Sequence, residues 1–204
     1  MTKNRFGRAA TGAWMLALFC VPLMPAAAAA QLYMPRTVKQ AFANGTRQAD
    51  GRPGPNYWQN HARYAIDITA TPPDRTVRGS EEITYYNESP DTLNALVFKL
   101  FLNIHEPGAP RAGGASEGYL NPGIEIDAFA VNGQPTPWQD SPRFFTWQPV
   151  RLAAPLLPGD SVKLSFDWHY PISLEDGREG MIDSTTYYLA YFYPRVAVYD
   201  DYSG

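Results

Sequence analysis

Histidine and glutamate residues are the first candidates for chemistry, because imidazole and carboxylate groups are common zinc ligands in peptidases. His105 and Glu106 begin like the HExxH signature. That signature places two histidines four residues apart on one helix and positions the glutamate to deprotonate a zinc-bound water. Here Ala109 stands in place of the second histidine, and a proline after the glutamate disfavours a helix. His61 and His169 are distant in sequence, so we predict neither a metal site nor catalytic residues in this chain.

A second pattern with catalytic potential is GASEG at positions 114–118, which matches the G-x-S-x-G motif of hydrolase nucleophiles. In those enzymes the serine occupies a strained turn between a buried strand and a helix. The residues around Ser116 are rich in glycine, alanine and proline, which favour neither element. A serine hydrolase that uses Ser116 is therefore our third hypothesis, behind two that follow from other features.

Two pairs of adjacent carboxylates, Glu81-Glu82 and Asp200-Asp201, could in principle serve acid–base chemistry. A glycosidase needs two carboxyl groups that face each other across the substrate. Neither pair is sufficient evidence for that arrangement. We interpret both pairs as solvated surface positions or as positions in a strand ladder.

Composition and charge exclude several classes of partner. The chain has 17 basic and 20 acidic residues, a formal net charge of −3, and no basic run that could neutralise a phosphate backbone. It also lacks a Walker-type loop and a GxGxxG turn, so we expect no nucleic acid and no nucleotide as partner. The length of 204 residues favours a single folded domain held by an apolar core, since the one cysteine, Cys20, lies close to the N-terminus.

The N-terminus has the features of an export signal. Three basic residues among the first eight precede an apolar run at 13–24, which is too short to span a bilayer as a mature helix. Small residues at 26–30 offer a cleavage site before Gln31. We therefore predict that residues 1–30 are a signal peptide and that the protein is periplasmic or secreted. No longer apolar run follows, so no stable membrane span is expected after leader removal.

The sequence then divides into an arm and a body. Val38, Ala41 and Phe42 have helical spacing, and Gly45 could end a short helix there. The following stretch to Asn56 is polar and rich in glycine and proline, as linkers are. We therefore predict an N-terminal arm or linker at 31–56 and a folded domain at 57–204.

The body has the two-residue period of β-strands. Alternation of apolar and polar residues is evident at 64–69 and strongest at 162–170, where the apolar positions are bulky and aromatic. Turn-forming sequences separate the segments, and 106–123 is predicted to be a long loop. We expect further strands at 78–87, 93–102, 124–131, 144–152 and 185–199, the last broken by Pro194. The fold class is therefore all-β, an antiparallel β-sandwich with a short N-terminal helix or arm.

Three segments carry a resemblance to a known family. They are NYWQN at 56–60, TYYNESPDTL at 84–93 and YPRVAVYDD at 193–201. Together they resemble the N-terminal domain of bacterial secreted metallopeptidases related to aminopeptidase N, and the resemblance covers essentially the whole chain after the leader. It implies a saddle-like β-sandwich that precedes a thermolysin-like zinc domain and packs against it. In that family, the segment before the junction faces the active-site cleft.

The resemblance also implies site residues near the end of the chain. Arg195 and the pair Asp200 and Asp201 match the family's arginine-containing segment and the acidic pair that follows it. Tyr191 and Tyr193 stand about where members of the family carry a glutamine and a glutamate that hold the free amino group of the substrate. These five residues are our candidates for the substrate cleft or the domain junction, although the two tyrosines are equally compatible with simple packing.

The resemblance further implies which parts lie elsewhere. The sequence stops at Gly204, before any HExxH motif, so zinc is expected in the missing catalytic domain and no cofactor in this chain. The expected partners are the catalytic domain of the same polypeptide and the N-terminus of a peptide substrate, and the chain alone is expected to be inactive. The alternative hypothesis is a free-standing secreted binding module for glycan or protein.

Overall fold

The computed structural model describes residues 33–140, 143–175 and 177–202. The predicted signal peptide lies outside the described residues. The chain divides into two compact units, Met1–Met34 and Pro35–Gly204, and every element named below belongs to the second. Within the described residues, none of the helices has the length and apolar character that a membrane span requires.

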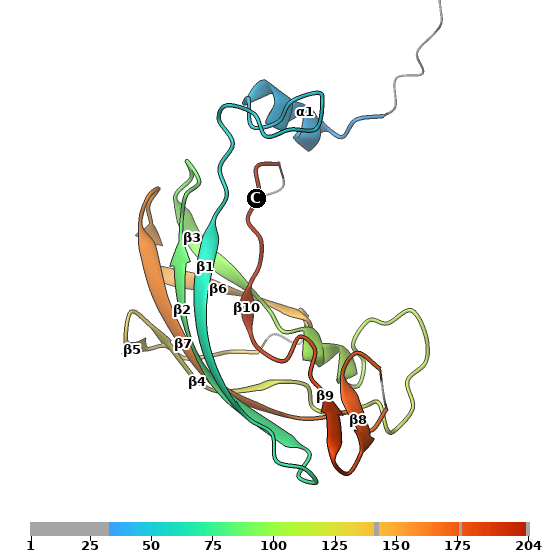
Figure 1. The fold of residues 1–204 in the computed structure, drawn as a ribbon. Helices are drawn as coiled ribbons and strands as arrows, with labels where there is room; N and C mark the ends of the chain where they lie inside the picture. Colours follow the sequence, from blue (N-terminus) through green and yellow to red (C-terminus); the bar gives the residue numbers. More distant parts are fainter. Residues whose placement is uncertain (1–32, 141–142, 176, 203–204) are drawn as a thin grey trace, which may run out of the picture. The chain divides into compact units, whose positions relative to one another are not determined.

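The protein is all-β and antiparallel, as predicted (Figure 1). One helix, α1 (Arg36–Ala43), precedes the strands, and Gly45 ends it with a φ of 73°. The larger sheet has the order β1 (His61–Thr69), β2 (Thr76–Tyr86), β7 (Ser161–Pro171), β4 (Glu125–Val131) and β5 (Gln134–Pro135). The smaller sheet has the order β10 (Arg195–Val196), β3 (Leu93–Lys99) and β6 (Trp147–Leu156), and β8 (Gly180–Asp183) pairs with β9 (Thr186–Tyr188).

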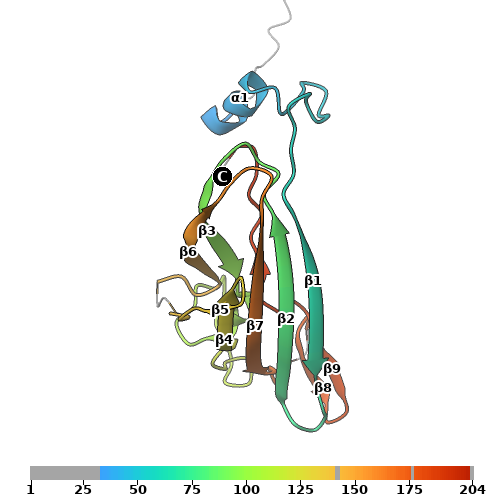
Figure 2. The ribbon, with the colours of Figure 1, turned by 90° about the vertical axis from the view of Figure 1, so that its left-hand side faces the viewer.

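The larger sheet is built on the pairing of β2 with β7. The two strands remain in register over their whole length, from Thr76 opposite Pro171 to Tyr86 opposite Ser161. Figure 2 shows β1, β2, β7 and β4 side by side, and Figure 1 shows that these strands are strongly curved. The apolar residues that alternate along β7 all point to the inner face, where they are buried: Val162, Leu164, Phe166, Trp168 and Tyr170.

Trp168 determines one position of the neighbouring strand. A Cβ atom at Gly79 would lie 2.2 Å from Cζ2 of the Trp168 ring, so only glycine fits opposite this side chain. The indole therefore lies across β2 and joins the inner faces of the two strands. Such close packing, at the density of an organic crystal, means that a larger residue at position 79 would displace the ring.

The predicted strands correspond in part to the observed ones: β6 runs over Trp147–Leu156 rather than 144–152, the short strands β5 and β8 were not predicted, and two further segments differ. The segment expected to be a strand at 93–102 leaves the sheet at Lys99 and continues as a 3-10 helix, η1 (Phe101–His105). The segment expected at 185–199 is regular only in the short strands β9 and β10, and Tyr191 between them has a φ of 58°. A non-glycine residue in the left-handed region interrupts a strand, so the chain turns before Pro194 rather than at it.

Glu81 lies in a place that the sequence did not suggest. The pair Glu81-Glu82 was interpreted as solvated or ladder positions, but Glu81 is only 3% exposed and points to the inner face of β2, whereas Glu82 is exposed. Neither carboxyl oxygen of Glu81 has a hydrogen-bond partner among the described residues. Burial raises the pKa of Glu81 to about 8, because the charged form loses its hydration.

Replacement of Glu81 by glutamine should remove a component of the pH dependence of stability. The pKa of Glu81 is about 8 in the folded protein against an ordinary 4.5, so its contribution is fully present below pH 4.5 and declines as the pH rises towards 8. The free energy of unfolding of the wild type, relative to Glu81→Gln, should fall by roughly 2–4 kcal/mol over this range. Urea titrations at several pH values measure it.

The matched control is Glu82→Gln, which changes the exposed carboxylate next in sequence and should leave the pH dependence of the wild type intact. Parallel stability curves for wild type and Glu81→Gln between pH 5 and 8 would contradict the assignment of a buried, neutral carboxyl group.

Candidate functional site

The five residues implicated by the family resemblance lie on one C-terminal segment, residues 189–202, but the structure separates them into three environments. The segment follows β9, contributes β10 to the smaller sheet and ends near α1 (Figure 1). Its apolar side chains Leu189, Phe192, Tyr193, Val196 and Tyr199 pack against the core. This packing holds the remaining side chains of the segment in place.

Arg195 and Tyr191 form a partly exposed cluster with Phe101 of η1, here called the Arg195 cluster. The guanidinium carbon of Arg195 lies 4.6 Å from the centroid of the Phe101 ring and 5.5 Å from that of Tyr191. The two rings are 5.1 Å apart, and Nη1 of Arg178 donates a 3.0 Å hydrogen bond to the Tyr191 hydroxyl. Tyr191 remains 40% exposed. The cluster presents a cation and a phenol at the surface, and cation–π attraction helps to hold both.

Tyr193 points the other way, into the molecule. Its ring packs edge-on against Tyr64, with centroids 5.7 Å apart, and against Phe192 at 5.1 Å. The Tyr64 hydroxyl accepts a 3.1 Å hydrogen bond from the backbone N–H of Val196, which ties the larger sheet to β10. Tyr193 thus packs in the core and lies apart from the Arg195 cluster.

Asp201 belongs to a third environment, at the end of the segment. Arg47, in the loop after α1, donates to both carboxylate oxygens of Asp201, with Nη2 at 2.7 Å and Nε at 3.0 Å, and the Thr46 hydroxyl donates a further bond of 2.6 Å. The Asp201 side chain is 2% exposed. The Arg47 guanidinium lowers the pKa of Asp201 to about 2, because its hydrogen bonds favour the charged carboxylate. We call this contact the Arg47–Asp201 clamp.

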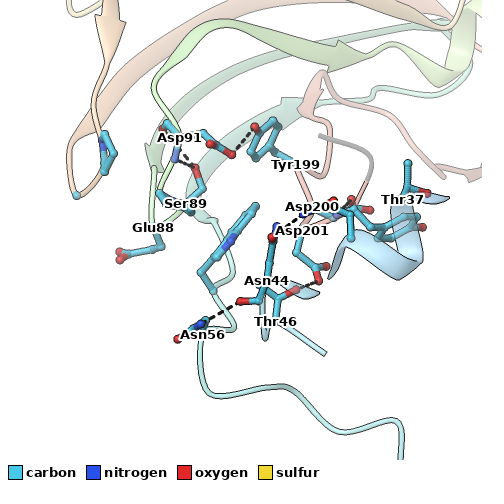
Figure 3. A pocket seen from close by; sticks show the side chains of 16 residues that line it. Thr37, Asn44, Thr46, Asn56, Glu88, Ser89, Asp91, Tyr199, Asp200 and Asp201 are labelled. Atoms are coloured by element: carbon cyan, nitrogen blue, oxygen red, sulfur yellow. Dashed lines mark hydrogen bonds between the residues drawn. The ribbon is translucent and has the colours of Figure 1, made fainter. Parts of the chain in front are cut away.

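Beside the clamp lies a cavity of about 890 Å³, here called the acidic cavity. Its walls come from α1, the loop that follows it, the turn between β2 and β3, the turn between β6 and β7, and residues 199–202. Four carboxylates line it, and Figure 3 shows them around the opening: Glu88, Asp91, Asp200 and Asp201. The three sequence segments that carry the family resemblance all reach this cavity, although their resemblance gave no indication of it.

Aromatic side chains complete the cavity wall. The Trp58 and Tyr199 rings are stacked with centroids 5.6 Å apart. The Tyr199 hydroxyl donates a 2.9 Å hydrogen bond to Asp91, as Figure 3 shows. Burial, together with this bond and the charge of Asp91, raises the pKa of Tyr199 to about 12, so the phenol remains a donor at any physiological pH. Sequence reasoning missed Trp58 and Asp91, because only the tertiary fold brings them together.

The two motifs with catalytic potential have structural roles. His105 is buried and uses both ring nitrogens, with Nδ1 2.9 Å from the carbonyl oxygen of Tyr119 and Nε2 3.0 Å from Oε2 of Glu179. Ser116 is exposed and hydrogen-bonded to Glu175, in a loop rather than between a strand and a helix. Among the described residues there is no group of three or more histidine, cysteine, aspartate or glutamate side chains that could hold a metal ion.

Comparison with known proteins identifies partial structural similarity only. No family model and no curated protein sequence matches the chain. An M1 zinc metallopeptidase from Deinococcus radiodurans, solved as a mutant with a Tyr-Ser-Ala substrate, is 18% identical over 65% of this chain and 25% of its own, with a TM-score of 0.39. A two-domain M1 zinc metallopeptidase mutant with bound L-tryptophan is 18% identical over 63% and 24%, with the same TM-score. The chain thus spans about a quarter of each, and both belong to the aminopeptidase N family that the sequence resembles.

Loss of the Arg47–Asp201 clamp should release the N-terminal segment without unfolding the sheets. In Arg47→Ala, hydrogen exchange of the backbone amides at 36–56 should accelerate by about tenfold or more. The segment can then open locally without breaking the hydrogen bonds between Arg47 and Asp201. Exchange in β2 and β7 should be unchanged. Mass spectrometry of peptic fragments measures both.

Arg52→Ala is the control, since Arg52 belongs to the same segment but makes only an exposed ion pair with Asp50. The clamp should also weaken in acid: the pKa of Asp201 lies below its ordinary 3.8, so its contribution is present above that value and is lost as the pH falls through about 2. Equal exchange in Arg47→Ala and Arg52→Ala would contradict a stabilising role for the clamp.

Proposed function

We propose that this chain is the non-catalytic N-terminal β-sandwich domain of a zinc aminopeptidase-like metallopeptidase, which packs against the catalytic domain and borders its peptide-binding cleft. The observation that carries the proposal is an apolar surface on the segment where the resemblance expects the junction. Val198, within the matched motif at 193–201, is 85% exposed. An exposed aliphatic side chain in an ordered segment favours a partner that covers it.

Val198 belongs to a wider apolar groove along the smaller sheet, here called the β3–β10 groove. Its volume is about 470 Å³. The aliphatic and aromatic residues that line it come from β2, β3, β6, β10 and the segment after β10: Tyr85, Leu93, Ala95, Leu96, Val97, Trp147, Val196, Ala197, Val198 and Tyr199. Among the described residues of its wall, Lys99 is the one that carries a charge. A partner that covers such a surface lowers the free energy of the complex by roughly 25 cal/mol for each Å² of apolar surface buried.

The Arg195 cluster lies next to this groove, because Arg195 and Val196 together form β10. A domain that covers the groove would therefore approach the cation of Arg195 and the hydroxyl of Tyr191. These two groups are the proposed border of the peptide cleft. They can donate hydrogen bonds to peptide carbonyl oxygens, whereas a carboxylate for the free amino group of a substrate would have to come from the partner domain.

The zinc ion that the resemblance implies does not fit the described residues of this chain. The imidazoles that contact carboxylates are already engaged with protein groups: His105 faces the Tyr119 carbonyl oxygen and Glu179, and His169 faces Asp127 and Glu125 through different ring nitrogens. A zinc site needs at least three such ligands around one open position. In the proposal, the metal, the base and the catalysis all belong to the second domain.

The proposal predicts how the purified chain behaves in assays for metal and activity. It should contain far less than one zinc per chain by plasma mass spectrometry and should release no amino acid from aminoacyl p-nitroanilides. Stoichiometric zinc together with turnover would refute it. Genomic DNA read beyond codon 204 should encode HExxH in frame, and an in-frame sequence that lacks any zinc motif would equally count against the idea.

Exposure of the groove predicts self-association of the isolated chain. Sedimentation velocity should show oligomers that grow with concentration, and Val198→Lys should shift the population towards monomer, because a charge cannot be buried without a partner. Ile68→Lys is the control, since Ile68 is exposed on β1, away from the groove. A wild-type chain that remains monomeric at high concentration would argue against a covered face here.

A further inference from the structure

The proposed function does not explain the acidic cavity. Tyr199 lines both this cavity and the β3–β10 groove, but the four carboxylates belong to the cavity alone. A volume of about 890 Å³ is within the range of sites that bind small molecules or a few peptide residues, and is much larger than a single ion needs. The cavity therefore has the size of a binding site for a short segment of chain.

The charges of the wall determine what could bind. Glu88, Asp91, Asp200 and Asp201 line the cavity, and among the described lining residues there is no lysine, arginine or histidine. Two basic residues lie outside the wall: Arg47 compensates Asp201 through the clamp, and Nδ1 of His61 lies 3.9 Å from Oε1 of Glu88. The potential of the remaining carboxylates disfavours an anionic ligand and favours a cationic one.

The aromatic wall narrows the chemistry further. Trp58 and Tyr199 are stacked against each other, whereas the Tyr202 ring is already covered by Arg47, whose guanidinium carbon lies 4.7 Å from its centroid. Planar guanidinium groups stack on such rings, and ammonium groups are attracted to their faces. Carboxylates beside aromatic rings therefore form a surface that matches the side chain of arginine or lysine, whose alkyl stem packs on the rings while its charge meets the carboxylates.

The turn between β2 and β3, which carries Glu88 and Asp91, is held by hydrogen bonds. Asn60 Oδ1 accepts hydrogen bonds from the backbone N–H groups of Glu88 and Ser89, at 2.7 and 2.9 Å. The amide of Asn87, which is fully buried, donates to the carbonyl oxygens of Asp91 and Leu156, at 2.8 and 3.1 Å. Because these bonds are already made, a ligand would not have to order this turn on binding.

We propose that the acidic cavity binds an arginine or lysine side chain of a peptide. The side chain lies with the Trp58 and Tyr199 rings on one side and the carboxylates of Glu88 and Asp91 on the other. The guanidinium or ammonium group takes the place of counterions near Glu88 and Asp91. The peptide backbone on either side of it meets the polar wall formed by Gln40 and Asn44 of α1 and its C-terminal cap.

The test compares two peptides of almost equal shape. Acetyl-Gly-Arg-Gly-amide and its citrulline counterpart differ in one positive charge, and isothermal titration calorimetry on the whole chain measures both. The arginine peptide should bind at least about tenfold more tightly, and the preference should shrink as salt rises from 20 to 500 mM, since the charges are only partly shielded from solvent. Equal affinities, or no binding of the arginine peptide at millimolar concentration, would overturn the proposal.

Variants locate the binding. Glu88→Gln should weaken the arginine peptide about fivefold or more and leave the citrulline peptide unchanged, and circular dichroism checks that the variant folds. Glu82→Gln, which removes an exposed carboxylate from the larger sheet, should have no effect. Binding of a neutral oligosaccharide that Glu88→Gln does not weaken, with no preference for arginine, would show a glycan site instead. Val198→Lys should leave peptide binding intact, so failure of this proposal and failure of the proposed function are distinguishable.

Discussion

Burial of the aromatic inner face of β7 is the constraint on which the rest of the structure depends. Phe166, Trp168 and Tyr170 project from one strand, and water cannot remain against so large an apolar surface at low free energy. The smaller sheet and the C-terminal segment cover it, with Phe98 and Phe192 in contact with these rings. Since the covering segment is fixed by its inward side chains, its outward side chains are fixed as well, and these are the candidates for function.

One segment therefore has both structural and functional roles. Tyr193 packs against Tyr64, and the Tyr64 hydroxyl accepts a bond from Val196, so the larger sheet holds β10 at its backbone. The neighbouring Arg195 is thereby directed to Phe101 and the surface. Farther along, Tyr199 meets Trp58 and Asp91 at the acidic cavity. The Arg195 cluster, the groove and the cavity thus follow one another along one short stretch of chain.

The sequence predicted the fold class because apolar and polar residues alternate in β1 and, most strongly, in β7, where one face of the strand is buried. The sequence was a poorer guide to the environment of single polar residues that are buried in the folded protein. Glu81 is of a residue type that is normally exposed, although the two-residue period of β2 places it on the inner face with Ile83 and Tyr85. His105 is a chemically suggestive residue whose ring serves to hold a loop. The acidic cavity was beyond prediction, since it requires Trp58, Asp91 and Tyr199 to meet in space, and no periodicity records such a contact.

The Arg47–Asp201 clamp has a consequence for how the molecule reaches its native state. The two residues are 154 positions apart, and closing so long a stretch of chain costs several times the thermal energy in entropy. The folded sheets between the two residues hold the ends of the domain close together and so offset this cost. The acidic cavity exists only when both ends are in place, so any molecule that occupies it adds its binding free energy to the native state alone. A bound molecule would therefore stabilise the arrangement in which both ends of the domain lie together.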